Sequence, residues 1–431
     1  MSQFPEIYLA VDNCFASKRW TAPEDWMREV GGAGLTYIEA SADTELDPLY
    51  LGAAYLKRWV SSVKEAEAKS GCHVTNLYSG HGTYATLGLA HTDEEVRGRF
   101  LERWLKPMVD VAHDVGAGFG FFCHAFPQRV LADQRAYDSA TNDLVASLSE
   151  LASYNASLPG ECEIGVEQMY TPHQVPWTIA QAHELLRRVW DAGGSPFYLT
   201  IDVGHQSGQH RFRMPEISVL TNAILVVRGG GMLPKDIWLG PDEERERFVL
   251  RAQDDSQSAD ELTRETLHRL SAYPYLFSRA GDSDPYRWLR ELAGWSPIIH
   301  LQQTEQTTSS HSPFNEETNA TGIIHGKDVL QAIYDHYRDA PNGVTPGSEG
   351  SGAEAGVTGG QRTGSSATTV VRSGSPRVTK IYLTLEIFAG TAETPEEIRR
   401  KIRDSVSYWR EFVPEDGMTV DALIERIGGC L

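Results

Sequence analysis

Residues 197–208 read FYLTIDVGHQSG, a stretch in which an apolar run ends in an acid and a histidine. The run from Phe197 to Val203 has the length and the β-branched content of a buried strand. Asp202 lies near its end, and His205 follows three residues later. An ordinary turn requires neither an acid nor an imidazole there. The stretch therefore indicates a strand that carries a functional site at its carboxyl end.

Seven further segments of the chain have strand-like runs. The eight predicted strands span residues 7–12, 36–40, 73–79, 118–124, 163–170, 197–203, 297–304 and 381–388. Helix-like segments lie between them, such as residues 21–34 with Thr21 as the predicted N-cap, and residues 394–412 with Thr394 as the cap and Pro395 at the first helical position. Eight strands that each lead to a helix predict an α/β fold, a (β/α)8 TIM barrel formed by residues 1–431 as a single domain.

Two segments interrupt the alternation. Residues 206–256 form a predicted insertion after the sixth strand, long enough to act as a lid over the barrel mouth. Residues 343–376 are rich in Gly, Ser and Thr and contain almost no large apolar side chains. Such a composition cannot offset the entropy lost on ordering, so this segment is predicted to be a low-complexity mobile loop before the eighth strand.

Composition and charge exclude several classes of protein. The chain is 41% hydrophobic and 23% charged, which is typical of a globular protein, and its apolar runs are too short to cross a bilayer. The N-terminus lacks the features of a signal peptide, and five scattered cysteines without CxxC spacing favour reduced thiols. These features predict a soluble, cytoplasmic protein. A net charge of −20 argues against nucleic-acid partners, and homo-oligomer formation is left open.

Polar side chains gather at the ends of the last four predicted strands. Glu167 ends an apolar run on the fifth strand, Asp202 on the sixth, and Glu386 lies between Leu385 and Ile387 on the eighth. On the seventh strand, His300, Gln302 and Thr304 share one face. In a parallel barrel the carboxyl ends of the strands meet at one rim, so Glu167, Asp202, Gln302 and Glu386 are expected to converge.

Three carboxylates in one water-poor mouth would repel one another unless a cation neutralised them. Oxygen ligands of this kind favour Mn²⁺ or Mg²⁺, with Co²⁺ as a third candidate, over a structural zinc ion. Taken singly, each acid has a simpler explanation as a helix cap or a partner in a loop salt bridge. That explanation is weakest for Glu386, because buried acids are almost never left unpaired. The occurrence of four polar groups on consecutive strands favours a site.

Other polar side chains after the strands are candidates for substrate binding. His81 and His124 follow the third and fourth strands and could bind hydroxyl groups, although a satisfied histidine at the rim is an equally good explanation. A phosphate could be held by cationic and polar groups that follow the first and seventh strands. These are Lys18, Arg19, Ser309, Ser310 and His311. Their alternative is an ordinary solvated loop.

Four short motifs resemble a known family. The strings GVEQMY, TIDVGH, HLQQT and LTLEIF are similar to the metal-site strands of the xylose-isomerase-like TIM-barrel superfamily of sugar and sugar-phosphate isomerases and epimerases. The longer strings LAVDNCFASKRW, EASADTELDPLY and NLYSGHGTYATLGLAHTD resemble its tetrulose-phosphate epimerase branch, the D-erythrulose 1-phosphate 3-epimerase type that acts in erythritol catabolism. The resemblance covers most of the chain except the two insertions.

This resemblance implies metal ligation by Glu167, Asp202, Gln302 and Glu386, with Gln302 where tagatose-type epimerases have histidine. It implies that His205 contacts the substrate, and that Gly204 lets the chain turn so that His205 can do so. The two glutamates would stand on opposite faces of a ketose or ketose phosphate. One would remove a proton and the other return one through a metal-bound cis-enediolate, which epimerises the carbon.

Three other functions compete with this hypothesis. An aldose–ketose or hydroxypyruvate-type isomerase would use the same metal site and return the proton to the neighbouring carbon. A nuclease of the endonuclease IV type shares the fold but needs a histidine-rich three-zinc cluster and a basic face, neither of which is evident in the sequence. A noncatalytic sugar-binding barrel would use the acids only to hold a structural ion.

Overall fold

The computed structural model describes residues 3–80, 87–339 and 377–428. His81, Cys430 and the predicted loop 343–376 therefore lie outside the described residues. Within the described part of the chain, every helix is too short or too polar to cross a bilayer. The four described cysteines are free thiols, as the sequence predicts.

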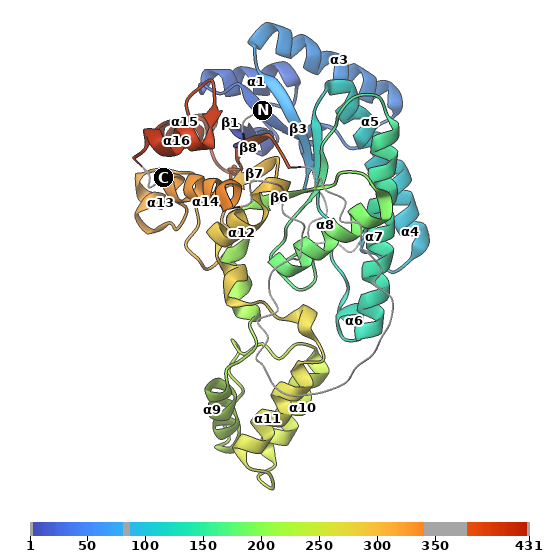
Figure 1. The fold of residues 1–431 in the computed structure, drawn as a ribbon, viewed down its shortest axis with the longest axis vertical. Coiled ribbons are helices and arrows are strands. Elements are labelled where there is room, and N and C mark those ends of the chain that lie inside the picture. Colours follow the sequence, from blue (N-terminus) through green and yellow to red (C-terminus); the bar gives the residue numbers. More distant parts are fainter. Residues whose placement is uncertain (1–2, 81–86, 340–376, 429–431) are drawn as a thin grey trace, which may run out of the picture.

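Eight parallel strands form a closed barrel, and the strands labelled in Figure 1 lie in the upper part of that view. They are β1 (Glu6–Asp12), β2 (Tyr37–Ser41), β3 (His73–Ser79), β4 (Gly118–Phe121), β5 (Ile164–Glu167), β6 (Tyr198–Asp202), β7 (Ile298–Leu301) and β8 (Lys380–Leu385). Each strand pairs with the next in sequence, and β8 pairs with β1, which closes the barrel. A short strand, β9 (Met418–Thr419), adds antiparallel to β1. The predicted TIM barrel is confirmed.

Helices surround the barrel (Figure 1). They are α1 (Pro23–Gly32), α2 (Ala42–Glu45), α3 (Ala53–Ser70), α4 (Glu94–Phe100), α5 (Lys106–Val115), α6 (Gln128–Leu131), α7 (Gln134–Ser157), α8 (Ile179–Gly193), α12 (Pro285–Leu292), α13 (Glu316–Thr321), α14 (Gly326–Asp339), α15 (Pro395–Arg410) and α16 (Val420–Arg426). A π-helical turn, η2 (Leu101–Leu105), joins α4 to α5.

The structure confirms one of the two predicted helix N-caps and contradicts the other. Thr394 caps α15 in a complete capping box, since its side chain accepts from the Glu397 N–H and the Glu397 carboxylate accepts from the Thr394 N–H. The prediction of Thr21 as the cap of α1 is wrong, because Ala22 takes the N-cap position without a side-chain hydrogen bond. Pro23 at the first helical position has no N–H to satisfy and a fixed φ suited to the helix.

Four strands end three residues earlier than the sequence predicts: β4, predicted to reach residue 124, ends at Phe121, and the other three are β5, β7 and β8. Pairing on β5, β7 and β8 stops at Glu167, Leu301 and Leu385, although burial continues beyond each of these residues. A burial pattern predicts where side chains are enclosed and does not predict where backbone pairing ends. Gln302 and Glu386 thus lie immediately after their strands, and the Glu386 N–H still donates to the Leu301 carbonyl at 3.0 Å.

The interior of the barrel is unusually polar. Outward-facing side chains such as Ile38, Leu199 and Ile299 are completely buried in the apolar core. Glu39 of β2 and His300 of β7 contact one another across the interior, where both are completely buried. Burial of a charge is costly unless it is paired, so these polar groups must compensate each other, and they form the floor of the site described below.

The connection between β6 and β7 carries a helical lobe. A short 3₁₀ segment, η3 (His205–Phe212), is followed by α9 (Ile217–Arg228), α10 (Asp242–Gln253) and α11 (Ala259–Leu270). The last three helices contact one another and extend away from the barrel (Figure 1). The predicted insertion 206–256 includes α9 and α10, and α11 continues the same lobe. The role of this insertion as a lid stays a prediction.

Candidate metal centre

Five carboxylates are buried at the carboxyl ends of the strands. Asp12 ends β1, Glu39 lies within β2, Glu167 ends β5, Asp202 ends β6 and Glu386 follows β8. Their exposed fractions are 1%, 0%, 3%, 0% and 6% respectively. Alternation along each strand turns these acids inward while their apolar neighbours face the helices. The strand ends thus bring the acids together as the sequence predicts for Glu167, Asp202 and Glu386.

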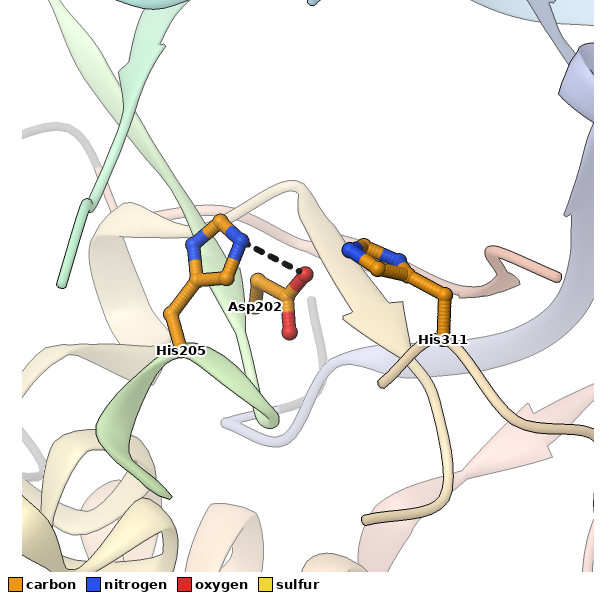
Figure 2. Close-up of side chains that lie close together, drawn as sticks. All are labelled: Asp202, His205 and His311. Carbon is orange, nitrogen blue, oxygen red and sulfur yellow. Dashed lines mark ion pairs between the residues drawn. The ribbon is translucent and has the colours of Figure 1, made fainter. Parts of the chain in front are cut away.

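The three predicted acids and one histidine form a compact group of donors. One ligand atom each from Glu167, Asp202, His300 and Glu386 lie within 4.8 Å of one another. A second group, formed by Asp202, His205 and His311, meets the same limit, and Figure 2 shows Asp202 between the two imidazole rings. Asp202 belongs to both groups and is therefore the centre of the site.

His300 bridges two acids from opposite sides of the barrel. Its Nδ1 lies 2.9 Å from Glu167 Oε1 and its Nε2 lies 2.8 Å from Glu39 Oε2. Both ring nitrogens must donate to carboxylates, which requires the doubly protonated imidazolium. Burial opposes this charge, but the negative charges of Glu39 and Glu386 raise the pKa of His300 well above its usual value. One positive charge is thus fixed beneath the site.

Burial and neighbouring charges shift the pKa values of three other acids in the site. Burial, together with the charges of Glu39 and Glu386, raises the pKa of Asp12 well above its ordinary value. Burial also raises the pKa of Glu386, although His311 and His300 counteract it. Asp202 is the exception: despite complete burial, the neighbouring histidines, with His205 first, lower its pKa to about 2. The Asp202 carboxylate therefore stays charged beside these histidines.

This donor set fits a divalent cation. Glu386 Oε2 is buried and receives no hydrogen bond from the described residues, although His300 Nδ1 and His311 Nδ1 lie 3.4 and 3.2 Å away. Buried carboxylates at this density suit hard cations such as Mn²⁺ or Mg²⁺. An ion among Glu167, Asp202 and Glu386 would favour the charged form of Glu386, against the burial that raises the pKa of this carboxyl group.

Gln302 also reaches the site, with its amide hydrogen-bonded on both sides. Its Nε2 donates to both oxygens of Asp202, at 2.9 and 2.8 Å. Its Oε1 accepts the backbone N–H of His311 at 2.6 Å and the Ser309 hydroxyl at 3.1 Å. Gln302 thus joins Asp202 to the loop that follows β7.

His205 is oriented towards Asp202 by the backbone of the preceding strand. Its Nδ1 lies 2.8 Å from the carbonyl oxygen of Gln168, which fixes Nδ1–H as the donor. Its Nε2 then faces Asp202 Oδ2 at 3.3 Å (Figure 2). The Gly204 N–H donates to Asp202 Oδ1 at 2.6 Å. This hydrogen bond holds the Asp202 carboxylate against the turn that follows β6.

Gly204 is required for a reason other than the predicted one. Its φ of −94° lies in a region open to any residue, so the turn itself does not demand glycine. A Cβ at this position, however, would lie 2.3 Å from Cδ of Gln302. Glycine is therefore needed because the Gln302 side chain packs directly against the backbone at this point.

A cavity of about 390 Å³ opens above the acids. Its lining includes Glu167, His205, His311 and Glu386. Tyr78 forms another part of the wall and donates its hydroxyl hydrogen to Glu167 Oε2. Both predicted catalytic glutamates therefore face the same space.

Several predicted substrate-binding residues lie elsewhere or have other partners. Lys18 is exposed, and the Arg19 guanidinium donates to the carbonyls of Gly390 and Glu393. His124 is only 3% exposed, and its ring packs against Phe100 and Phe122 at 4.7 and 4.6 Å. Ser309 bonds to Gln302, and the Ser310 hydroxyl donates to the Gln303 carbonyl at 3.0 Å. Among the described candidates for substrate contact, His205 and His311 line the cavity.

Sequence reasoning missed four members of this site. Asp12, Glu39 and Tyr78 were not identified, and His300 was placed on the correct face without a role. Glu39 has the same feature that led to the prediction of Glu386: it is an acid within a mainly apolar strand segment, TYIEA. The same test applied to every strand would have found it.

One family model matches part of the chain. Residues 27–221, less than half of the 431 residues, match the model described as the xylose isomerase-like TIM barrel. The closed eight-stranded barrel agrees with this likeness in fold.

Two individual proteins are similar to it. A segment of 52 residues is 40% identical to D-erythrulose 1-phosphate 3-epimerase of Brucella abortus (strain 2308). That segment covers 12% of this chain and only 17% of the relative's length. The crystal structure of a candidate xylose isomerase from Rhodospirillum rubrum superposes with a TM-score of 0.61 over 95% of this chain and 100% of that chain. At 16% identity this likeness concerns the fold.

Proposed function

We propose that the chain is a divalent-metal-dependent epimerase of a ketose or ketose phosphate, with erythrulose 1-phosphate as the favoured substrate. The observation that carries the proposal is that Glu167 and Glu386, both buried, face one cavity and converge on Asp202. Two carboxylates beside one bound sugar are what removal and return of a proton require. The short match to a tetrulose-phosphate epimerase supports the choice of substrate.

Glu167, Asp202 and Glu386 would hold the ion. When bound, it supplies positive charge that stabilises the negative charge developing on the substrate oxygens as a neighbouring C–H is deprotonated. Mn²⁺ or Mg²⁺ is the favoured ion, with Co²⁺ as an alternative, because all of these donors are oxygens.

The chain's own residues would move the protons. Tyr78 and His300 both donate to Glu167, which fixes the orientation of its carboxylate. Glu386 lies at the cavity wall, where its carboxylate can exchange a proton with the substrate carbon. One glutamate takes the proton from the substrate carbon and the other returns one to the opposite face, which inverts the centre. His205, at the cavity wall, would orient the substrate hydroxyls.

Solvent exchange tests this function. The Mn²⁺-loaded protein is incubated in D₂O with C4 to C6 ketoses and their 1-phosphates, and the products are analysed by NMR. The proposal predicts deuterium at C3 together with the C3 epimer. An aldose product with deuterium at C2 would favour the isomerase instead. Absence of exchange into every compound would favour a noncatalytic sugar-binding barrel.

Substitution of Gly204 by alanine is expected to weaken Mn²⁺ binding about tenfold, because the new Cβ would displace Gln302 and with it Asp202. Gly208→Ala is the matched control, since a Cβ there would meet no atom within 4 Å. Mn²⁺ affinity is measured by titration followed by electron paramagnetic resonance, and circular dichroism confirms folding. Equal affinity in the two variants would refute the role of Gln302 in holding Asp202.

A further inference from the structure

Exposed apolar side chains concentrate on the helical lobe that follows β6. In the described part of the chain, ten large hydrophobic side chains are at least 40% exposed, and six of them belong to this lobe. The six are Ile217, Val219, Leu225, Val226, Met232 and Leu250. Four of the six lie on α9, which Figure 1 shows at one edge of the lobe. Apolar side chains gathered in this way mark an interaction site.

The α9 helix is apolar on both of its faces. Its buried face, which packs against α10 and α11, consists of Leu220, Ala223, Ile224 and Val227. Its outward face consists of the exposed residues Ile217, Ser218, Val219, Asn222, Leu225 and Val226. Residues 217–227 include no charged side chain. Because a helix that is apolar all round is normally enclosed by protein, we expect the outward face to be covered in the working assembly.

The outward face is complementary to a second copy of itself in the antiparallel orientation. When two α9 helices pair about a point between residues 221 and 222, Ile217 lies opposite Val226 of the second copy. Ser218 then lies opposite Leu225 of the second copy, so a small side chain meets a large one. The two Asn222 side chains meet at the two-fold axis, where their amides can hydrogen-bond to each other. One patch thus supplies both halves of the interface.

The two ends of α9 carry opposite charges. Glu216 is the N-cap residue and Arg228 is the last residue of the helix. The Arg228 guanidinium donates to the carbonyls of Asp254 and Gln257 at 3.2 and 2.6 Å, and both of these acceptors are uncharged. Antiparallel pairing brings each Glu216 towards the Arg228 of the other copy and sets the two helix dipoles against each other. Charge complementarity therefore favours a second copy as the occupant, in this orientation.

We propose that the chain forms a two-fold symmetric homodimer by antiparallel pairing of the outward faces of α9. This inference does not depend on the proposed activity. One pair of helices buries less than the roughly 1,600 Å² of a standard interface, so the dimer is expected to be weak, with a Kd in the micromolar range. Two copies that each carry a net charge of −20 repel each other, so added salt should strengthen the dimer by screening.

Sedimentation velocity of the full chain, at concentrations of about 1 to 200 µM, tests the dimer. The wild-type protein is expected to show a reversible monomer–dimer equilibrium. Leu225→Glu places a carboxylate in each half of the interface and is expected to raise the dimer Kd about 100-fold or more. Leu49→Glu is the matched control, because Leu49 is 53% exposed against 55% for Leu225 and lies outside the lobe. Its Kd should equal that of the wild type, and circular dichroism confirms folding.

Disulfide cross-linking tests the orientation, with the wild-type protein as the background for the native cysteines. Asn222→Cys is expected to form a linked dimer under mild oxidation, because residue 222 lies at the two-fold axis. Ile217→Cys is expected to form none, since the two copies of residue 217 lie about 14 Å apart along the helix.

Three outcomes would overturn the inference. The first is a wild-type protein that stays monomeric over the whole concentration range. The second is a dimer that Leu225→Glu leaves intact, which would place the interface outside α9. The third is cross-linking of Ile217→Cys without cross-linking of Asn222→Cys, which would indicate parallel helices. The cross-linking test decides alone if Leu225→Glu does not fold.

Discussion

Glu386→Gln is expected to reduce turnover about a thousandfold or more. Glutamine preserves the shape of the side chain but cannot accept a proton, and removal of a positioned acid or base typically costs two to four orders of magnitude. Glu386 is 6% exposed and lines the cavity next to His311, so water cannot easily replace it. The measurement is kcat on the ketose that shows solvent exchange, at saturating Mn²⁺.

The matched control is Glu317→Gln, an exposed glutamate on α13, for which turnover should be unchanged. Mn²⁺ bound by the Glu386 variant is measured in parallel, because the side chain is also a proposed ligand. Turnover within tenfold of the wild-type value, with the ion still bound, would mean that Glu386 moves no proton in the reaction.

The barrel could be predicted because its strands carry strong local signals. β3 was predicted at both ends, since the segment His73–Ser79 lies between Gly71 and Gly80 in the sequence. The carboxyl ends of β4, β5, β7 and β8 were predicted three residues too late, because burial continues into the residues that follow each of these strands. Strand pairing depends on neighbours in space, and a single sequence contains no direct record of them.

The convergence of Glu167, Asp202 and Glu386 could also be predicted, because a parallel barrel directs the ends of all its strands to one rim. The contact between His300 and Glu39 could not be predicted from the sequence. It joins β7 to β2 across the interior, and which side chains meet there depends on the tilt and stagger of the barrel.

Loop residues were the least predictable. Lys18 and His124 both have left-handed backbones, with φ of 68° and 64°. In a non-glycine residue this conformation is set by tertiary contacts, so the direction of the side chain cannot be inferred from neighbouring letters. The orientation of the Gln302 amide is similar, because it depends on the His311 N–H nine residues later.

Removal of divalent cations with a chelator is expected to abolish turnover, and addition of Mn²⁺ is expected to restore it. Without the ion, the negative charge that develops on the substrate would face Glu167, Asp202 and Glu386 directly, and the loss of several kcal/mol of stabilisation corresponds to roughly a thousandfold in rate. Activity before chelation, after chelation and after readdition is the measurement. Full activity in the chelated, metal-free protein would contradict this mechanism.

Equilibrium dialysis of the chelated protein against Mn²⁺ measures whether one divalent ion binds where Glu167, Asp202 and Glu386 converge, as we propose. Asp202→Asn is the comparison, because this residue belongs to both donor groups. We predict one Mn²⁺ per chain in the wild-type protein and none in the variant at the same free concentration. Wild-type protein that takes up no Mn²⁺, Mg²⁺ or Co²⁺, or a variant that binds as well as the wild type, would contradict it.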